Sequence, residues 1–304
     1  MAYIEFMKPR VLLTGCTGEV GSRLTALLVS SGYYVVGIRG KRECSIRNPL
    51  HSCTQIDLLH SNISAFISNI KPDILIHTSW ITSPPEFWDS SINYEWLNSS
   101  KKIIDAFEGT GGKYLVVTGT CAEYSWMLDE SLAEDSPELP STTYGKSKLE
   151  LLKWIRSGTL PFLWTRTFFQ FGSNEPSGRL IPSLIDSLLK GKVIKIRNAN
   201  DTRDFVYIDD IVGVLHSLIC QKREGVVNIG SGTGTKVTEI VRILTQLLGQ
   251  EHLVHFESLP TQTSTIVSNP KKLNSLIGSY PWTSLSASLA ESIEARVLNQ
   301  QQLS

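Results

Sequence analysis

The stretch Val11-Leu12-Leu13-Thr14-Gly15-Cys16-Thr17-Gly18-Glu19-Val20-Gly21 joins a short apolar run to a glycine-rich turn. The apolar run is typical of a buried strand, and residues 22–31 have the composition of an apolar helix. Between a strand and a helix, glycines permit a tight turn, a close backbone approach to a pyrophosphate and packing of the helix on the strand. An ordinary turn is the alternative. We expect a dinucleotide-binding turn formed by Gly15, Thr17, Gly18, Glu19, Val20 and Gly21.

Strand and helix patterns alternate along the first two thirds of the chain. This alternation predicts an α/β fold with a Rossmann-type doubly wound parallel sheet. A polar, turn-rich segment at 171–178 marks an exit from the sheet, and the signals weaken after residue 249. We expect a dinucleotide-binding domain at 8–170 plus 203–230 and a smaller mixed α/β substrate-binding domain at 171–202 plus 231–304. The predicted strands are 11–14, 33–38, 55–58, 73–80, 113–118, 160–166, 193–197 and 226–230; the predicted helices are 22–31, 63–70, 93–107, 147–154, 180–189, 211–220, 237–248 and 285–299.

Composition excludes several classes of partner. The 304 residues include 29 basic and 29 acidic side chains, so no charge bias favours nucleic acid or an anionic membrane. No apolar run is long enough to span a bilayer, and residues 1–10 lack the pattern of a signal peptide. The five cysteines are scattered, and no two of them form a CxxC pair. The sequence therefore indicates neither a metal site nor a disulfide framework. A reducing, cytoplasmic setting is expected.

The end of the second predicted strand bears on the choice of cofactor. An NAD site usually places a carboxylate about 20 residues after the glycines, where it binds the ribose 2′-hydroxyl. This chain has Arg39 instead, followed by Lys41 and Arg42. Basic side chains suit a 2′-phosphate, so NADP(H) is preferred and NAD(H) remains possible; a solvated basic turn is the alternative. Further on, Asp57 and Leu58 are expected near the adenine.

Two later strands are predicted to deliver polar residues to the same sheet edge. His77, Thr78 and Ser79 end the fourth strand, where ligands bind in doubly wound sheets. We expect these residues to contact the cofactor, with His77 in a packing and hydrogen-bonding role. Thr118 and Thr120 end the fifth strand, and residues 81–88 form a loop that is placed to cover the pocket.

Tyr144 and Lys148 stand four residues apart in a segment that is predicted to be helical. This spacing places the phenol and the ammonium on one helical face, about 5–6 Å apart at Cβ. A nearby cation favours the phenolate, so it lowers the pKa of a tyrosine toward neutrality. The same pair also occurs by chance on solvated helices. The Thr120 hydroxyl is a group that bonds a substrate oxygen and shares its proton with a neighbouring tyrosine.

Together these motifs resemble the extended short-chain dehydrogenase/reductase family, in its nucleotide-sugar-modifying, NAD-dependent epimerase/dehydratase-like branch. The resemblance implies that Tyr144 is the acid/base, that Lys148 binds the nicotinamide ribose and lowers the Tyr144 pKa, and that Thr120 orients the substrate. It also implies a nucleotide-sugar substrate and a homodimer formed through residues 89–108 and 143–157. The residues that carry the resemblance are Gly15, Gly18, Gly21, Asp57, His77, Asn93, Thr120, Tyr144, Lys148, Arg203-Asp204-Phe205-Val206 and Asn228-Ile229-Gly230.

The resemblance extends to the substrate pocket. Arg203 is expected to contact the nucleotide diphosphate, and Arg179 is a second candidate for which a surface position is the alternative. The expected substrate-binding residues are Trp80, Thr120, Cys121, Ala122, Phe169, Arg179 and Arg203.

Departures from the family pattern reduce the number of reactions that the resemblance allows. The 4,6-dehydratases have Asp-Glu after the catalytic hydroxyl, whereas this chain has Cys121 and Ala122, so dehydration is disfavoured. The fucose-forming epimerase-reductases use a cysteine two residues after the hydroxyl; Cys121 follows it by one and is expected to be pocket wall. Phe169 stands where 4-epimerases often have asparagine. Glu123 is either an extra acid in the pocket or a side chain that caps or faces water.

The run Gly119-Thr120-Cys121-Ala122-Glu123-Tyr124, with Trp80, is similar to a subgroup from bacterial surface-polysaccharide and deoxysugar pathways. This similarity implies NADPH-dependent reduction of a dTDP- or CDP-linked 4-keto-6-deoxyhexose at C4. One alternative is a 4-epimerase with tightly bound NAD. A second alternative is a non-catalytic NADP-binding regulator.

Overall fold

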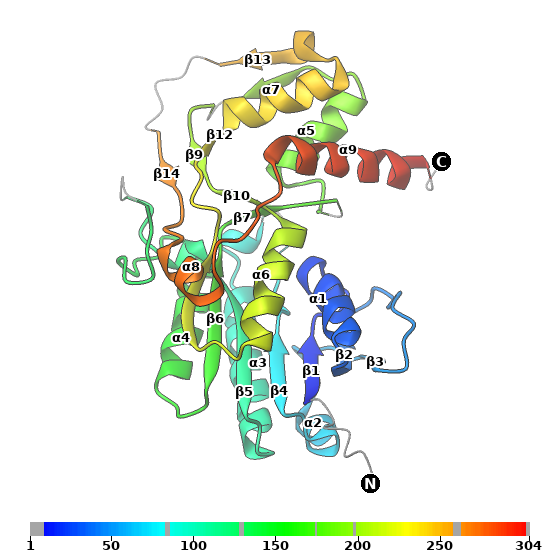
Figure 1. The fold of residues 1–304 in the computed structure, drawn as a ribbon, viewed down its shortest axis with the longest axis vertical. Helices are drawn as coiled ribbons and strands as arrows, with labels where there is room; N and C mark the ends of the chain where they lie inside the picture. The colour runs from blue at the N-terminus through cyan, green and yellow to red at the C-terminus, as the bar shows by residue number, and fades with distance from the viewer. Residues whose placement is uncertain are drawn as a thin grey trace.

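The computed structural model describes residues 9–82, 86–127, 131–173, 175–196, 199–257 and 263–301. A seven-stranded sheet in the order β11-β6-β5-β4-β1-β2-β3 forms its lower part (Figure 1). Every neighbouring pair is parallel. The strand order reverses between β1 and β4, which is where ligands bind in doubly wound sheets. The strands are β1 (Arg10–Thr14), β2 (Tyr34–Arg39), β3 (His51–Gln55), β4 (Ile74–His77), β5 (Tyr114–Thr120), β6 (Phe162–Thr167) and β11 (Gly225–Ile229).

Helices cover both faces of this sheet because its central strands are apolar on both sides. In β1, Val11 and Leu13 pack into one core and Leu12 packs into the other. Helices α1 (Glu19–Ser30) and α6 (Ile208–Cys220) pack together on the first face. Helices α2 (Ser64–Ile70), α3 (Ile92–Gly109) and α4 (Thr143–Arg156) cover the second face. The predicted doubly wound fold is confirmed.

A smaller group of elements lies beyond the carboxyl ends of the strands (Figure 1). Its main helices are α5 (Leu180–Leu189), α7 (Val237–Leu248) and α9 (Leu285–Gln301), and α8 (Lys271–Ile277) returns toward the sheet. Short strands pair as β7 (Phe169–Phe171) with β10 (Phe205–Tyr207), β8 (Ile194–Ile196) with β13 (Val254–Phe256), and β9 (Thr202–Arg203) with β12 (Thr235–Lys236) and β14 (Thr265–Ile266). Three 3₁₀ turns are η1 (Glu86–Trp88), η2 (Cys121–Glu123) and η3 (Glu251–Leu253). The division of the chain at 171, 203 and 231 stays a prediction.

Several predicted boundaries differ in the structure: α1 begins at Glu19 instead of residue 22, α4 begins at Thr143 instead of residue 147, and β4 ends at His77 instead of residue 80. The third strand was expected at 55–58, but β3 ends at Gln55, because this edge strand is polar and pairs with β2 alone. Helix α6 was expected to begin at Ile211, but it begins at Ile208. Asp209 and Asp210 therefore lie in its first turn, where carboxylates interact favourably with the helix dipole.

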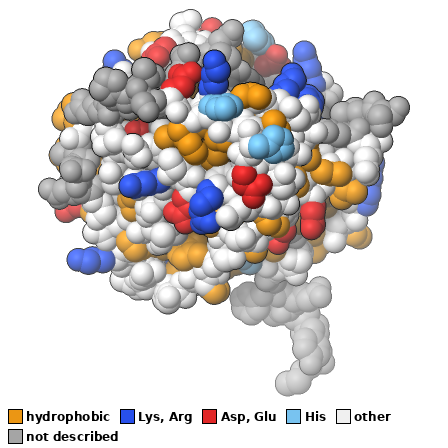
Figure 2. Space-filling view, turned by 90° about the horizontal axis from the view of Figure 1, so that it is seen from above, with side chains coloured by type: hydrophobic (Ala, Val, Ile, Leu, Met, Phe, Trp, Pro, Cys, Tyr) orange, Lys and Arg blue, Asp and Glu red, His pale blue; other side chains and the backbone are white. Residues whose placement is uncertain are grey.

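Surface composition agrees with the balanced charge of the chain. Figure 2 views the smaller group of elements from above and shows basic and acidic side chains interspersed on that face. Within the described ranges, no helix is long and apolar enough to cross a membrane.

Candidate active site

A cavity of about 900 Å³ lies between the carboxyl ends of the strands and the smaller group of elements. It brings together most of the residues that the sequence singled out. From the predicted cofactor set it is lined by Gly15, Gly18, Glu19, Val20, Gly21, Thr78, Ser79, Thr118, Tyr144 and Lys148. From the predicted substrate set it is lined by Trp80, Thr120, Cys121, Phe169, Arg179 and Arg203.

The glycine-rich turn has the shape that a pyrophosphate requires. Gly15 has φ +76°, a left-handed conformation that favours glycine. A Cβ on Gly21 would lie 2.1 Å from the Gly15 carbonyl oxygen, so a side chain there would displace helix α1 from the turn. Gly18 precedes the first residue of α1 and supplies no side-chain cap, so the helix N-terminus is available to an anion. These features fit a bound dinucleotide.

An acidic side chain follows the turn directly. Glu19, the first residue of α1, is paired with Arg23 at 3.0 Å, and Arg23 also contacts Asp209 at 2.6 Å. Burial raises the pKa of Glu19, while the Arg23 charge opposes the rise. The Arg23 guanidinium therefore offsets a carboxylate that would otherwise repel phosphate.

Tyr144 and Lys148 lie on the first turns of α4, against the end of β5. The Thr142 hydroxyl caps α4 by accepting from the Gly145 N–H at 3.1 Å. A Cβ on Gly145 would lie 2.2 Å from the Ala122 carbonyl oxygen, so glycine permits the helix to approach η2 closely. Tyr144 and Thr120 line the same cavity, and the Thr120 side chain is close enough to lower the pKa of the phenol, so α4 brings Tyr144 back beside the end of β5.

Lys148 is buried, with its side chain directed at the cavity wall. Its Nζ donates to the Thr118 carbonyl oxygen at 2.9 Å and lies 3.9 Å from the centroid of the Trp80 ring. Burial lowers the pKa of Lys148 to about 7, and the Glu123 carboxylate opposes this shift. The ammonium is thus set to lose its proton near neutral pH.

The Tyr144 phenol differs from the sequence-based expectation. Burial raises its pKa above the ordinary value, against the Thr120 hydrogen bond and the Arg179 charge, which lower it. The predicted lowering of the pKa by Lys148 is therefore wrong for the protein alone. The cause is an apolar surround: Phe87, Trp88 and Trp80 meet the Tyr144 ring edge-on at centroid distances of 5.3, 5.7 and 6.5 Å.

This aromatic surround was largely missed from the sequence. Phe87, Trp88 and Trp126 line the cavity, and Trp126 meets Trp88 at a centroid distance of 5.9 Å. Asn93 fixes the arrangement: its Oδ1 accepts from Trp80 Nε1 at 2.8 Å, and its Nδ2 donates to the Phe87 carbonyl at 2.6 Å. The 81–88 loop was expected to cover the pocket, and Thr82, Phe87 and Trp88 of this loop do line the cavity; residues 83–85 lie outside the described ranges.

Glu123 is a structural residue and does not line the cavity. Its carboxylate is fully buried, pairs with Arg166 at 2.7 Å and accepts from Trp164 Nε1 and the Thr120 N–H. The idea of an extra pocket acid is therefore wrong, because a buried guanidinium and the backbone of η2 occupy its oxygens. Ala122, a predicted substrate contact, also lies outside the lining, beneath Gly145.

Several predicted cofactor residues lie outside the large cavity. His77 is buried in the sheet between Thr14 and Ser100, 2.8 Å from each hydroxyl, and burial lowers its pKa to about 3. This position agrees with the packing role expected for His77, but His77 does not line the cavity. Asp57 is exposed and bonds His60 at 3.0 Å, and the buried Leu58 accepts from Ser99 through its carbonyl.

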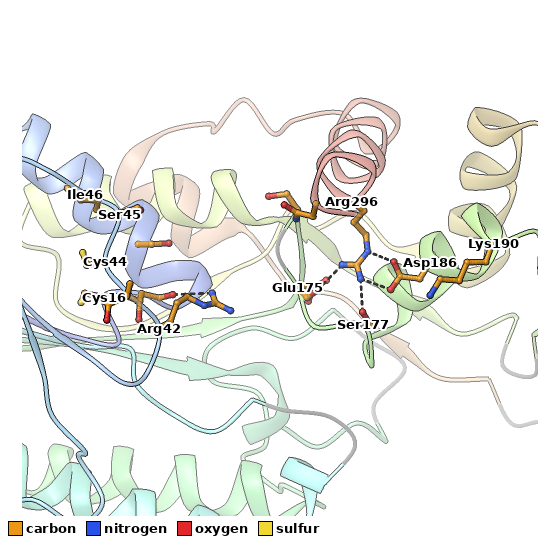
Figure 3. A pocket seen from close by; sticks show the side chains of 15 residues that line it. Cys16, Arg42, Cys44, Ser45, Ile46, Glu175, Ser177, Asp186, Lys190 and Arg296 are labelled. Carbon is orange, nitrogen blue, oxygen red and sulfur yellow. Dashed lines mark hydrogen bonds and ion pairs between the residues drawn. The ribbon is translucent and has the colours of Figure 1, made fainter. Parts of the chain in front are cut away.

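Of the basic residues at the end of β2, Arg42 contacts the glycine turn, whereas Arg39 pairs with the loop that follows. Arg39 pairs with Glu43 at 2.9 Å, and Arg42 donates to the Thr17 carbonyl oxygen at 3.2 Å. Thr17 and Arg42 line a second cavity of about 810 Å³, whose far wall carries Arg296 and its partners (Figure 3).

The smaller group of elements contributes two arginines to the large cavity. Arg179 precedes α5 and lies 3.7 Å from Glu175 and 5.3 Å from the centroid of the Phe87 ring. Arg203 pairs with Asp201 at 2.8 Å and lies over Phe169. A guanidinium beside an uncapped helix N-terminus is suited to a phosphate group.

Glu175 was not singled out from the sequence. It is buried in the cavity wall, and its Oε1 has no hydrogen-bond partner within the described ranges. Burial raises the pKa of Glu175 to about 7, against the charge of Arg179. It lies in a turn-rich segment that carries no strand or helix signal, so sequence patterning had no means to find it.

Comparison with known proteins agrees with this geometry. The sequence model of the NAD dependent epimerase/dehydratase family matches residues 11–230. The GDP-6-deoxy-D-talose 4-dehydrogenase of Aggregatibacter actinomycetemcomitans is 23% identical, over 95% of this chain and 98% of that protein. The UDP-glucose 4-epimerase of Bacillus subtilis is 24% identical, over 88% of this chain and 91% of that protein. The structure of UDP-N-acetylglucosamine 4-epimerase from Methanobrevibacter ruminantium superposes with a TM-score of 0.84 at 19% identity, covering 96% of this chain and 99% of that one. The chain belongs to the NAD dependent epimerase/dehydratase family.

Proposed function

We propose that the protein reduces a nucleotide-activated 4-keto-6-deoxyhexose at C4, with Tyr144 as the proton donor and Lys148 and Thr120 as its partners. The observation that carries this proposal is that Tyr144, Lys148 and Thr120 line the same cavity as the glycine turn. A relative of similar length is a 4-dehydrogenase of a GDP-linked 6-deoxysugar, which supports oxidation–reduction at C4.

Tyr144, Thr120 and Lys148 have different roles in the proposed reaction. A bound nicotinamide supplies the hydride. Tyr144 donates its phenolic proton to the alkoxide that forms at C4, and Thr120 holds the same oxygen. A raised phenol pKa keeps that proton on Tyr144 until the oxygen gains charge. Lys148 supplies positive charge to the phenolate that remains.

The substrate is proposed to lie along the aromatic wall. Trp88, Trp126 and Phe169 offer apolar surface to the sugar, and a 6-deoxy sugar presents an apolar methyl group. Arg203 lies over Phe169 and Arg179 lies beside Phe87, at the margin of this aromatic surface, where both are proposed to bind the diphosphate.

The cofactor is proposed to be NADP(H) in preference to NAD(H). Arg39 supports this, with Lys41 and Arg42 after it, because no carboxylate ends β2. Thr17, Asp57, Leu58 and His77 remain proposed cofactor neighbours, although none of them lines the large cavity.

A second candidate is 4-epimerisation with tightly bound NAD. Several curated relatives are UDP-glucose 4-epimerases, and Cys121 and Ala122 leave no acid pair for dehydration. An epimerase returns the hydride to the same sugar, so it consumes no cofactor.

One assay separates the two candidates. The absorbance of added NADPH, and then of NADH, is followed with dTDP-, CDP-, GDP- and UDP-linked 4-keto-6-deoxysugars. Stoichiometric loss of NADPH with one of them supports the reductase. Conversion of a UDP-hexose with no loss of cofactor overturns it in favour of the epimerase.

The protein is also proposed to form a homodimer through α3 and α4. These helices pack side by side on one face of the sheet, and Tyr94 of α3 is exposed. Light scattering of the purified chain tests this, and a monomer at micromolar concentration contradicts it.

A further inference from the structure

Four potential metal ligands from separate segments converge behind the glycine turn. Cys16 follows Gly15 in the turn, and Cys44 lies in the 40–50 loop between β2 and β3. His51 and Cys53 are two residues apart on β3, so their side chains point to the same face of the sheet. Figure 3 shows Cys16 and Cys44 together at one end of the second cavity.

The distances between these side chains suit a single metal ion. The sulfur atoms of Cys16 and Cys53 are 3.4 Å apart, and Cys44 Sγ lies 3.9 Å from each ring nitrogen of His51. Ligand atoms of Cys16, His51 and Cys53 all lie within 4.8 Å of one another, and Cys44 Sγ lies next to this group through its contacts with His51. Tetrahedral zinc, with Zn–S of about 2.3 Å and Zn–N of about 2.0–2.1 Å, separates its ligand atoms by about 3.5–3.8 Å.

The Ile46 carbonyl and Gly37 also favour a metal ion at this position. His51 Nδ1 lies 3.4 Å from the Ile46 carbonyl oxygen, a contact that favours a proton on Nδ1 and leaves the Nε2 lone pair for a metal. A Cβ on Gly37 would lie 2.7 Å from Cys16 Sγ and 3.1 Å from His51 Nε2. The strand β2 therefore needs glycine at this position to leave room for the cluster.

We propose that Cys16, Cys44, His51 and Cys53 form a structural zinc site. Three thiolates and an imidazole are a ligand set that selects zinc over harder cations. Four protein ligands close the tetrahedron, so no position remains for a catalytic water. The ion ties the irregular 40–50 loop to both the phosphate-binding turn and the edge strand β3, alongside the Arg42–Thr17 hydrogen bond.

The spacing 16-44-51-53 explains why no sequence motif indicates this site. Zinc motifs are recognised by cysteines that are close in the chain, whereas here the parallel pairing of β2 with β1 and β3 assembles the ligands. The earlier expectation of no metal site was based on sequence spacing alone.

The test is the metal content of the full chain, purified with a thiol reductant and without chelator, then incubated with zinc chloride and desalted. We expect about one zinc per chain by elemental mass spectrometry. Replacement by cobalt(II) is expected to give the visible bands of a tetrahedral ion and sulfur-to-cobalt charge transfer. These readouts do not involve catalysis, so they stand apart from the proposed reaction.

Single variants locate the site. Cys44→Ser, His51→Ala and Cys53→Ser are each expected to lower zinc content several-fold, whereas Cys220→Ser on α6 serves as the matched control and retains it. Circular dichroism of each variant checks folding, and the cobalt spectrum of the unmodified chain is a second line that needs no variant. Absence of zinc and cobalt binding by the unmodified chain overturns the proposal. Retention of zinc by a folded Cys44→Ser/Cys53→Ser double variant overturns it too, as does a Cys16–Cys53 disulfide in the reduced preparation.

Discussion

The Lys148 ammonium lies 3.9 Å from the centroid of the Trp80 ring while it donates to the Thr118 carbonyl oxygen. The Nε1–H of the same indole donates to Asn93 Oδ1. Trp80 thus connects the lysine of α4 to the buried amide of α3, and its ring supplies attraction to a cation that burial disfavours.

Replacing Trp80 tests this connection. Trp80→Leu is expected to lower the free energy of unfolding by about 2 kcal/mol, because it removes the cation–π contact and leaves Asn93 Oδ1 without its donor. Trp80→Phe keeps an aromatic face and is expected to lose less. Urea unfolding measures both, with Trp154→Phe as a control outside the cavity. Equal losses for Leu and Phe would show that the ring face contributes nothing.

Tyr144→Phe tests the proton donor. Turnover is expected to fall by about 10²–10⁴-fold because the proton to C4 is lost, whereas cofactor binding stays within about two-fold. Tyr94→Phe, an exposed tyrosine on α3, is the control and leaves turnover unchanged. Cofactor-binding titrations and single-turnover rates give the two readouts. A non-catalytic regulator would show no turnover in either protein.

Lys148 predicts a pH dependence. Its pKa is about 7 in the folded protein and about 10.4 in an unfolded chain, so the unfolded state holds one more proton between these values. This group therefore makes the unfolding free energy rise with pH across that window, by about 1.4 kcal/mol per unit. The difference between the unmodified chain and Lys148→Met isolates the effect in urea unfolding at pH 7 to 9. A difference that is constant with pH would mean that the lysine stays charged.

The affinity for the cofactor is expected to fall with rising pH, whereas the unfolding free energy rises. The ammonium is the main form below its folded pKa of about 7, and it is lost as pH rises through that value. Binding of the ribose by Lys148 should therefore weaken above pH 7 in the unmodified chain and stay flat in Lys148→Met, as a fluorescence titration would show.

The buried pair Arg166–Glu123 is expected to dominate local stability. Arg166→Met leaves an unpaired carboxylate in the core and is expected to cost about 3–5 kcal/mol of unfolding free energy. Lys113→Ala, which breaks the exposed pair with Asp73, is the matched control and should cost less than about 1 kcal/mol. If the two variants unfold at the same urea concentration, the buried pair contributes no more to stability than the exposed pair, and the prediction is wrong.

Arg39 predicts cofactor preference. Arg39→Ala is expected to raise the KM for NADPH by about tenfold or more and to leave that for NADH unchanged, because only the 2′-phosphate loses a charge-assisted hydrogen bond. Arg47→Ala, in the same loop, is the control. A parallel rise in both KM values would point to a role in folding the loop.

Strongly patterned features were predictable from the sequence. The apolar strands, the glycine turn and the Tyr144–Lys148 helix follow from local periodicity and spacing, and the structure places them as expected. The edge strand β3 carries His51, Ser52 and Thr54, so it has no apolar run to reveal it.

Features that depend on long-range burial were out of reach. The raised pKa of Tyr144 comes from Phe87 and Trp88, which lie more than 50 positions away in sequence. The partner of Glu123 is equally remote, since Arg166 comes from β6. Spacing along the chain contains no information on either environment.

The position of β11 has a consequence for synthesis of the chain. Among the strands that the structure describes, β11 pairs only with β6, yet it is made after α5 and the short strands that follow. A nascent chain that has emerged only as far as α5 therefore presents β6 as an open, apolar hydrogen-bonding edge, which is a template for pairing with other chains. Until residues 225–229 leave the ribosome, this edge of β6 is therefore expected to be open to pairing with other newly made chains.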